Sequence, residues 1–262
     1  MEPLENNVSP EHPLGELATL VLGLALVGLA LLAVVWLAVE GAVRWLPVAW
    51  EERVFAGSPL ESPRARELDA LMRRLARHWP ENAYALEIEV VEAPAPNAFA
   101  APGGQLLVTS ALLEQAASEN ELAFVIGHEL GHVAGRDPLR ALGRGLLVSL
   151  ALAAVGGDEG ASLAASAAQL GERSFSREQE RAADRFALRL VAAEYGHVAG
   201  AADFLRRLPD AGEGGAAVRA ASWLATHPRS AARVAELEAL AHQNAWATAG
   251  ELTPLPAGLR GE

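Results

Sequence analysis

The stretch His128-Glu129-Leu130-Gly131-His132 determines how the rest of the chain is interpreted. On a helix, residues four apart share one face, so both imidazoles can reach the same metal ion. Glu129, next to the first imidazole, can then contact a water on that ion without binding the ion itself. The pattern predicts a zinc site on a helix, with His128 and His132 as ligands and Glu129 as general base.

The residues ahead of this motif predict the helix that it needs. Ser118 can accept a hydrogen bond from the Glu121 amide while the Glu121 side chain reaches back, which is the pattern of a capping box. We therefore expect a helix over about 119–134 that ends near Gly135.

Two segments before this helix have the patterns of strands. Residues 85–92 alternate apolar and polar side chains, as a half-buried strand does. Residues 97–100 and 105–109 flank a Pro-Gly-Gly turn, which predicts a β-hairpin. The expected fold is α+β and mainly helical: a zincin-like catalytic domain with a small sheet or hairpin beside the active-site helix.

A catalytic zinc needs a third protein ligand and an open position for water. The chain has no cysteine, and no third histidine follows at short spacing, so a carboxylate is expected. Glu180 and Asp184 are four apart on a helix predicted over 176–193, so one can bind zinc while the other orients a ligand imidazole. On spacing alone Glu178 and Glu172 remain rivals, and a solvated charged face is the alternative.

The other predicted elements are helical. The short apolar stretches 145–157 and 161–170 are expected to pack in the protein or lie in a membrane interface, and a re-entrant hairpin stays open. Helical patterns also occur after Ser62-Pro63 and over 110–117, 198–207, 216–224 and 230–243.

An uncharged run near the N-terminus predicts a membrane anchor. Leu17 to Val39 comprises 23 residues without a charge, which as a helix span roughly 34 Å, enough for a bilayer core. Trp45 and Trp50 follow, where interfacial aromatic residues are found. The run is longer than that of a cleavable signal peptide and has no basic residue before it, so we expect a retained single span in the lipid bilayer.

Basic residues predict the orientation of this span. Arg44 and Arg53 lie just after the run and no Lys or Arg precedes it, so the positive-inside rule places the catalytic domain in the cytoplasm. The expected location is the cell (inner) membrane. The expected division of the chain is an N-terminal tail (1–16), the anchor (17–39), a juxtamembrane connector (40–62), a zinc metallopeptidase domain (63–244) and a Pro/Gly-rich tail (245–262).

The charge of the chain excludes one class of partner. Its 262 residues have a net charge of −12. An acidic protein repels phosphate backbones, so no nucleic acid is expected to bind. The lack of cysteine also excludes disulfides and thiolate metal sites.

The chain resembles the zinc metallopeptidase family that includes HtpX and the CAAX prenyl endopeptidases. The similarity spans about residues 66–240. Four segments match in order: Asn97-Ala98-Phe99-Ala100 with its Pro-Gly-Gly turn, His128 to His132, Ser176-Arg177 through Glu180 to Asp184, and Thr226-His227-Pro228 followed by Arg233.

The resemblance implies roles for several of these residues. It implies that Glu180 is the third ligand of one Zn²⁺ per chain and that Asp184 supports a ligand imidazole. It places His227 and Arg233 near the substrate carbonyl. It also implies that Asn97, Ala98 and Phe99 belong to an edge strand that holds the substrate.

One feature departs from the HtpX pattern. HtpX-like members have two membrane spans between the second histidine and the glutamate, whereas this interval contains only short apolar stretches here. We therefore expect one anchor and a compact domain. Two properties of the family, intramembrane access of the substrate and prenylated substrates, are not inferred for this chain.

The predicted activity is zinc-dependent endopeptidase cleavage of polypeptides bound in extended form. Recognition through the main chain tolerates many sequences, which favours a role in protein quality control. Two alternatives stay open: a non-catalytic membrane-bound chaperone or adaptor that keeps a zincin fold, and a zinc hydrolase of small amides. Glu129 argues against the first, because a scaffold needs no general base, and the edge strand argues against the second.

Overall fold

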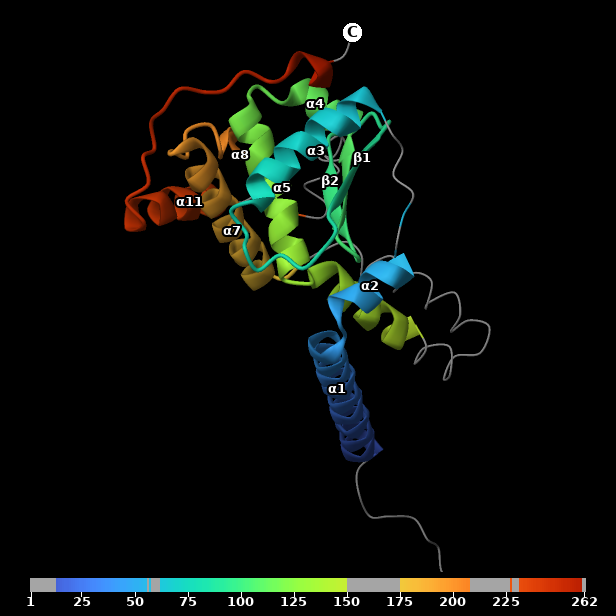
Figure 1. Ribbon diagram of the computed structural model, residues 1–262. Coiled ribbons are helices and arrows are strands. Elements are labelled where there is room, and N and C mark those ends of the chain that lie inside the picture. The colour runs from blue at the N-terminus through green and yellow to red at the C-terminus, as the bar shows by residue number, and fades with distance from the viewer. Residues whose placement is uncertain are drawn as a thin grey trace, which may run out of the picture.

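The computed structural model describes residues 13–55, 57, 62–149, 175–207, 227 and 231–260. They form a helical domain with one small sheet and a long N-terminal helix (Figure 1). The elements are α1 (Pro13–Trp45), α2 (Val48–Phe55), α3 (Pro63–Ala76), β1 (Glu87–Val91), β2 (Ala98–Ala101), β3 (Gln105–Thr109), α4 (Ser110–Gln115), α5 (Glu119–Ala134), α7 (Arg177–Tyr195), α8 (Asp203–Arg207), α11 (Ala231–Gln243) and the 3-10 helix η1 (Ala257–Leu259), with residues 137–149 also helical.

The sheet has the strand order β1-β3-β2, so β2 is an edge strand. The predicted hairpin is confirmed: β2 pairs antiparallel with β3 through a turn in which Gly103 and Gly104 have φ angles of 88° and 84°, a region that favours glycine. The parallel pairing of β1 with β3 was not predicted. Because β1 occupies the other side of β3, β2 has a partner on one side only and its second side is a free edge.

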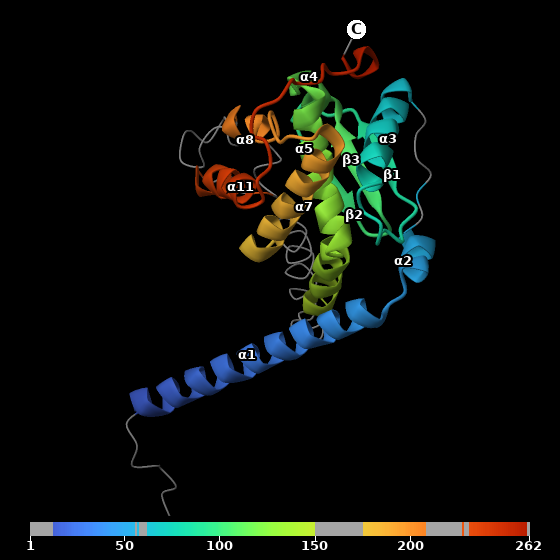
Figure 2. The same ribbon diagram turned by 60° about the vertical axis from the view of Figure 1, so that its left-hand side comes forward.

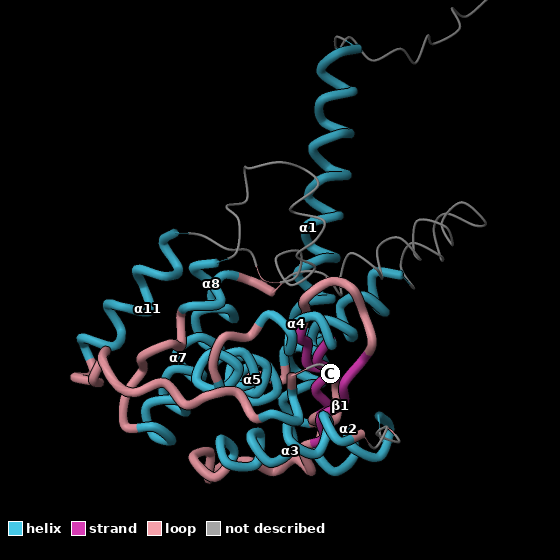
Figure 3. The backbone as a smooth tube through the Cα atoms, turned by 90° about the horizontal axis from the view of Figure 1, so that it is seen from above, coloured by secondary structure: helices cyan, strands magenta, loops and turns pink. Residues whose placement is uncertain are grey.

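Helix α5 is the centre of the domain, with the sheet on one side and α7 on the other (Figures 2 and 3). Two glycines bring α5 and α7 close together. A Cβ atom on Gly131 would lie 2.7 Å from Ala183 Cα, and one on Gly127 would lie 3.1 Å from Ala187 Cα. The absence of a side chain at Gly131 therefore allows α7 to pack closely against α5.

The N-terminal ends of α5 and α7 are each capped by a serine next to them in the sequence. Helix α5 covers the predicted range, and the Ser118 hydroxyl accepts from the Glu121 amide as expected. The Glu121 carboxylate, however, accepts from the Ala117 amide at 3.2 Å rather than from Ser118. A full capping box occurs instead at α7, between Ser176 and Gln179.

Helix α1 is apolar and long enough to cross a membrane. Its candidate span runs over Leu14–Trp45 with mean hydropathy 2.8 and no buried residues in its most apolar window. The C-terminal end of α1 packs on the helix at 137–149, where Val39 and Val43 contact Leu139. The residues expected to be a connector are thus partly the end of α1 and partly α2.

Helix α2 is tied into the domain by one buried carboxylate. Glu51 is 2% exposed and accepts hydrogen bonds from Arg136 (2.6 Å), the Tyr84 hydroxyl (3.1 Å) and the Gly103 amide (3.0 Å). Arg136 also donates to the Val43 carbonyl (2.6 Å) near the end of α1. This network joins α1, α2, the hairpin turn and the end of α5.

Replacing Glu51 by alanine is expected to destabilise the fold by about 3–5 kcal/mol, because Arg136 would be left largely buried without its counter-charge. The free energy of unfolding in denaturant, measured on the full chain in detergent, tests this. Asp69→Asn is the control, since its partner Arg73 is mostly exposed and the loss should stay within about 0.5 kcal/mol. Equal effects of the two substitutions would contradict the role of Glu51.

The C-terminal segment lies along the domain at the end away from α1 (Figures 1 and 2). The Glu119 amide, at the start of α5, donates to the Thr253 carbonyl, and Leu255 and Leu259 are buried. Of the other predicted helices, 198–207 is helical only over 203–207. The predicted helix 216–224, Glu172 and most of 145–170 lie outside the described residues.

Candidate metal centre

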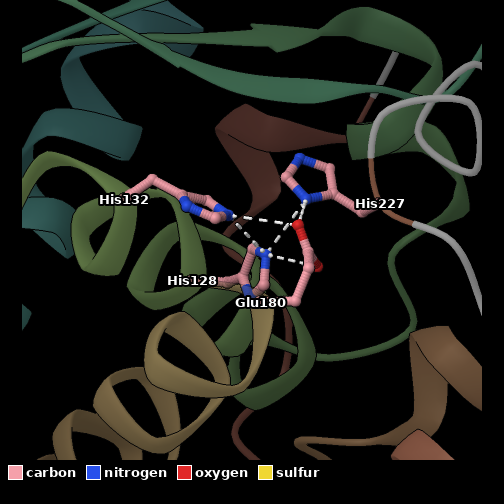
Figure 4. A group of neighbouring side chains, drawn as sticks. All are labelled: His128, His132, Glu180 and His227. Carbon is pink, nitrogen blue, oxygen red and sulfur yellow. Dashed lines mark hydrogen bonds and ion pairs between the residues drawn. The ribbon is translucent and has the colours of Figure 1, made fainter. Parts of the chain in front are cut away.

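Four buried side chains meet where α5 faces α7. His128 and His132 come from α5, Glu180 from α7, and His227 from a separate segment, and all four point toward one another (Figure 4). The two imidazole Nε2 atoms are 3.1 Å apart. Each lies 3.5 Å from one carboxylate oxygen of Glu180.

These distances fit a metal ion at the centre of the group. Two nitrogens each about 2.0–2.1 Å from a tetrahedral zinc would be about 3.3 Å apart. The Nδ1 atoms of His128 and His132 each lie 2.9 Å from a carboxylate, of Asp184 and Asp137 respectively. An Nδ1–H that donates to a carboxylate leaves a lone pair on Nε2. Two lone pairs and the Glu180 carboxylate then face one another, and a cation satisfies all three.

The pKa shifts in the cluster favour a charged Glu180 and a charged His132 beside a neutral His227. Burial lowers the pKa of His132, but hydrogen bonds to Asp137 and Glu180 outweigh burial and raise that pKa to about 9. Burial acts to raise the pKa of Glu180, yet hydrogen bonds to three histidines hold it well below its usual range. Burial lowers the pKa of His227. The site therefore stabilises a carboxylate among imidazoles.

The structure brings His227 into the same group. Its Nδ1 atom lies 2.7 Å from Glu180 Oε1 and 3.2 Å from His128 Nε2. Its Nε2 atom lies 3.6 Å from Glu129 Oε1. His227 is therefore placed between the predicted ligands and the predicted base.

Asp184 is held by Arg233. The guanidinium donates to both carboxylate oxygens of Asp184, at 2.6 and 2.7 Å, and lies 3.1 Å from Glu180 Oε2. Both side chains are almost fully buried. Arg233 thus contacts the carboxylates of both Asp184 and Glu180, and Asp184 contacts His128, as a residue that orients a ligand would.

Asp137 was missed by the sequence analysis. It follows the Gly135-Arg136 turn after α5 and accepts from His132 Nδ1, while Gln179 of α7 donates to its other oxygen at 2.6 Å. A Cβ atom on Gly135 would lie 2.9 Å from Asp137 Oδ2, so the glycine leaves space for the Asp137 carboxylate to fold back toward His132. Helical spacing gives no signal for a contact made across a turn.

If His132 binds a metal ion, replacing Asp137 by alanine is expected to weaken the binding of added zinc by about 10–100-fold, the usual cost of losing a group that orients a ligand histidine. Competition with a fluorescent zinc chelator measures the affinity. Asp203→Ala, at a partly exposed carboxylate of α8 that pairs with Arg206, should leave the affinity unchanged. An unchanged zinc affinity in Asp137→Ala would contradict the role of Asp137 in orienting His132.

The Glu129 carboxylate lies between the cluster and the edge strand. Its Oε2 atom accepts a hydrogen bond from the Ala100 amide of β2 at 3.0 Å. Among the residues that the structure describes, its Oε1 atom has no hydrogen-bond partner. In an antiparallel pair of strands, alternate residues point their backbone amides away from the partner strand. The Ala100 amide points to Glu129, so the Ala98 amide, two residues earlier, points to the same free edge of β2.

A largely apolar cavity of about 360 Å³ adjoins this edge. The exposed Phe99 lines it, together with Phe55 of α2 and His227. Asn97 also lines the cavity, and its Oδ1 atom is buried without a hydrogen-bond partner among the described residues. The predicted substrate residues of β2 thus lie beside the cluster, whereas Arg233 contacts Asp184 and Glu180 and is not among the residues that line the cavity.

A helix with two facing histidines and an adjacent glutamate, packed beside an edge strand, is the architecture of the zincin-like metallopeptidases. Comparison with known proteins specifies the group. The family model "Peptidase family M48" matches residues 62–241, and this chain belongs to that family. The predicted resemblance is confirmed.

Three relatives show the extent of the similarity. Metalloprotease LoiP of Escherichia coli (strain K12) is 32% identical over 187 residues, covering 67% of this chain and 70% of LoiP. Mitochondrial metalloendopeptidase OMA1 of Schizosaccharomyces pombe is 32% identical over 155 residues, 58% of this chain and 45% of OMA1. A protease HtpX homolog of Moorella thermoacetica is 32% identical over 120 residues, 44% of this chain and 38% of the homolog.

Proposed function

We propose that this protein is a zinc-dependent endopeptidase held at a membrane by α1. In this proposal His128, His132 and Glu180 bind one zinc ion and Glu129 is the general base. The observation that carries it is the position of Glu129, whose carboxylate lies between the cluster and the free edge of β2. A base in this place can reach a water and a peptide on the strand at once.

Zinc, when bound, polarises a carbonyl oxygen and makes a water more acidic. Glu129 Oε1 takes a proton from the attacking water and returns it to the leaving amine. The Ala100 amide holds Glu129 Oε2 and so directs the other oxygen away from β2. The substrate main chain pairs in extended form with the edge at Ala98 and with the carbonyl of Ala100, whose amide holds Glu129, and Asn97 and Phe99 contact it from the adjoining cavity.

Arg233 acts in this proposal as a positioning residue rather than as a substrate contact. Its two hydrogen bonds to Asp184 fix that carboxylate, which in turn holds His128 Nδ1. Its contact with Glu180 Oε2 at 3.1 Å fixes the third ligand. Both contacts keep the ligand atoms directed at one point.

His227 is proposed to stabilise the oxyanion that forms at the scissile carbonyl. A fourth-ligand role is its rival, because its Nδ1 lies among the ligand atoms. His227→Ala is expected to lower kcat by about 100-fold or more, as loss of one oxyanion donor does, with zinc content unchanged. Steady-state rates and bound zinc, measured on one preparation, test this. A sharp fall in zinc affinity would instead assign His227 to the metal.

Location is part of the proposal. Helix α1 crosses the cell (inner) membrane once, and Arg44 and Arg53 favour a cytoplasmic catalytic domain. The proposed division of the chain remains the anchor at 17–39 and a peptidase domain over about 63–244, with α2 packed onto that domain. The acidic net charge argues against a nucleic-acid partner.

Cleavage of an unfolded polypeptide by the full chain in detergent, before and after chelation and zinc return, tests the activity. Loss on chelation and recovery with zinc are expected. Zinc near one per chain without cleavage of any polypeptide would favour the non-catalytic chaperone or adaptor. Cleavage of small amides alone would favour a different hydrolase.

Protein quality control is the proposed biological role, because binding through a strand edge reads mainly the main chain. We expect many unrelated unfolded or membrane-associated proteins to be cleaved. A proteome-wide cleavage screen measures this breadth. A narrow preference for one native protein would reject the quality-control role and leave the peptidase activity intact.

A further inference from the structure

Exposed apolar side chains gather beside the end of α1. Among the described residues outside α1, the exposed large apolar side chains are Trp50, Val54, Phe99, Leu146 and Leu252. Trp50 and Val54 lie on α2, and Leu146 lies on the helix at 137–149, both next to the C-terminal end of α1 (Figures 1 and 2). Trp45, at the end of α1, is 85% exposed.

The helix at 137–149 meets α1 at a defined depth. Val39 is the last residue of the uncharged run. A Cβ atom on Gly143 would lie 3.2 Å from Val39 Cγ1, and Leu139 and Leu147 belong to the same apolar contact. Leu146, three residues after Gly143, lies on the neighbouring face of the helix. The crossing therefore lies where the apolar part of α1 ends.

Charges at this level match a membrane boundary. Glu40 follows Val39 directly and pairs with Arg140 at 2.9 Å and with Arg144 at 3.9 Å. Arg44 and Arg53 are exposed nearby and can contact anionic headgroups. Exposed tryptophans beside basic residues are typical of the layer between acyl chains and headgroups.

The orientation of α2 is fixed. Glu51 is buried against Arg136 and the hairpin turn, which holds Trp50 and Val54, one helical turn apart, on an exposed side. Arg136 also donates to the carbonyls of Val43 and Leu46 at the end of α1. Helix α2 therefore cannot turn its apolar side inward without breaking this network.

We propose that the catalytic domain rests on the bilayer through a second contact, which we call the membrane seat: Trp45, Trp50, Val54 and Leu146. Its partner is the boundary between headgroups and acyl chains of the bilayer that α1 crosses. The inference rests on the anchor role proposed for α1. The seat adjoins the metal centre, since Asp137, which accepts from His132, begins the helix at 137–149.

The natural chain has no cysteine, so single-cysteine variants can be labelled directly. A polarity-sensitive fluorophore is placed at Val54→Cys and at Leu146→Cys in the full chain, reconstituted in phosphatidylethanolamine–phosphatidylglycerol vesicles. Lipids with a nitroxide near the ester end of the acyl chain serve as quenchers. Leu252→Cys, exposed on the C-terminal segment, is the matched control, and Leu29→Cys reports on α1.

The nitroxide near the ester end is expected to quench the fluorophore at positions 54 and 146 and to leave the fluorophore at position 252 unquenched. A nitroxide near the methyl end of the acyl chain is expected to quench the fluorophore at position 29. Quenching at 29 with positions 54 and 146 behaving like 252 would overturn the seat and keep the anchor. No quenching at 29 would overturn both. Zinc-dependent cleavage, measured separately, does not enter this result.

Discussion

Glutamine in place of Glu129 is expected to lower kcat for peptide cleavage by about 100- to 10,000-fold, the usual contribution of a general base. Zinc content and thermal stability should stay near those of the natural chain. Glutamine keeps the shape of the side chain, and its oxygen can still accept from the Ala100 amide. Its amide group, however, cannot take a proton from water at the position of Oε1.

Initial rates on an unfolded polypeptide, with bound zinc measured on the same samples, test this prediction. Glu114→Gln is the control, because Glu114 is an exposed carboxylate on α4. Cleavage at the natural rate would reject Glu129 as the base. Loss of zinc together with cleavage would instead mean that Glu129 helps to hold the metal.

Alanine in place of Glu180 is expected to remove zinc from the purified protein. Loss of a direct ligand should exceed the roughly 10–100-fold loss in affinity caused by removing a group that orients a ligand. The two histidines would remain with their Nε2 atoms 3.1 Å apart but without the carboxylate that balances the charge of the ion. Peptide cleavage should fall with the metal.

Mass spectrometry of bound metal gives the result, and Glu178→Ala is a closely matched control. Glu178 lies two residues away on α7 but is exposed, whereas Glu180 is 7% exposed within the cluster. Zinc near one per chain is expected in the control and near none in Glu180→Ala. Full zinc in both would reject the three-ligand site.

The comparison of these two glutamates shows why spacing could not choose between them. The choice depends on which face of α7 packs against α5. Gly127 and Gly131 are four apart, as are Ala187 and Ala183 opposite them, and their close contact turns the Glu180 side of α7 inward. A pair of small residues on each helix was the available signal, and it has meaning only once the two helices are known to be neighbours.

The features that were predicted well depend on near neighbours in the chain. The bounds of α5 follow from the Ser118 cap and the Gly135 stop, and the i, i+4 spacing places both imidazoles on one face. The hairpin follows from two glycines with positive φ between apolar runs. Such interactions close within a few residues, so the local sequence is sufficient.

Other features needed the assembled fold. Asp137 reaches His132 across a turn in which Arg136 has a φ of 53°, an uncommon conformation that no periodicity indicates. Arg233 meets Asp184 from 49 positions away in the chain. Helix α2, expected as part of a connector, is held by the buried Glu51.

The amino-acid order alone was enough to predict a histidine pair with its adjacent glutamate on a helix, an edge hairpin and an apolar N-terminal span. Which carboxylates meet the imidazoles, where Glu129 lies relative to β2, and how α2 and the helix at 137–149 lie beside α1 came only from packing. A helix or a turn is stabilised by contacts a few residues apart. The surroundings of the metal centre are set by contacts between distant segments, whose distances depend on how the whole core closes.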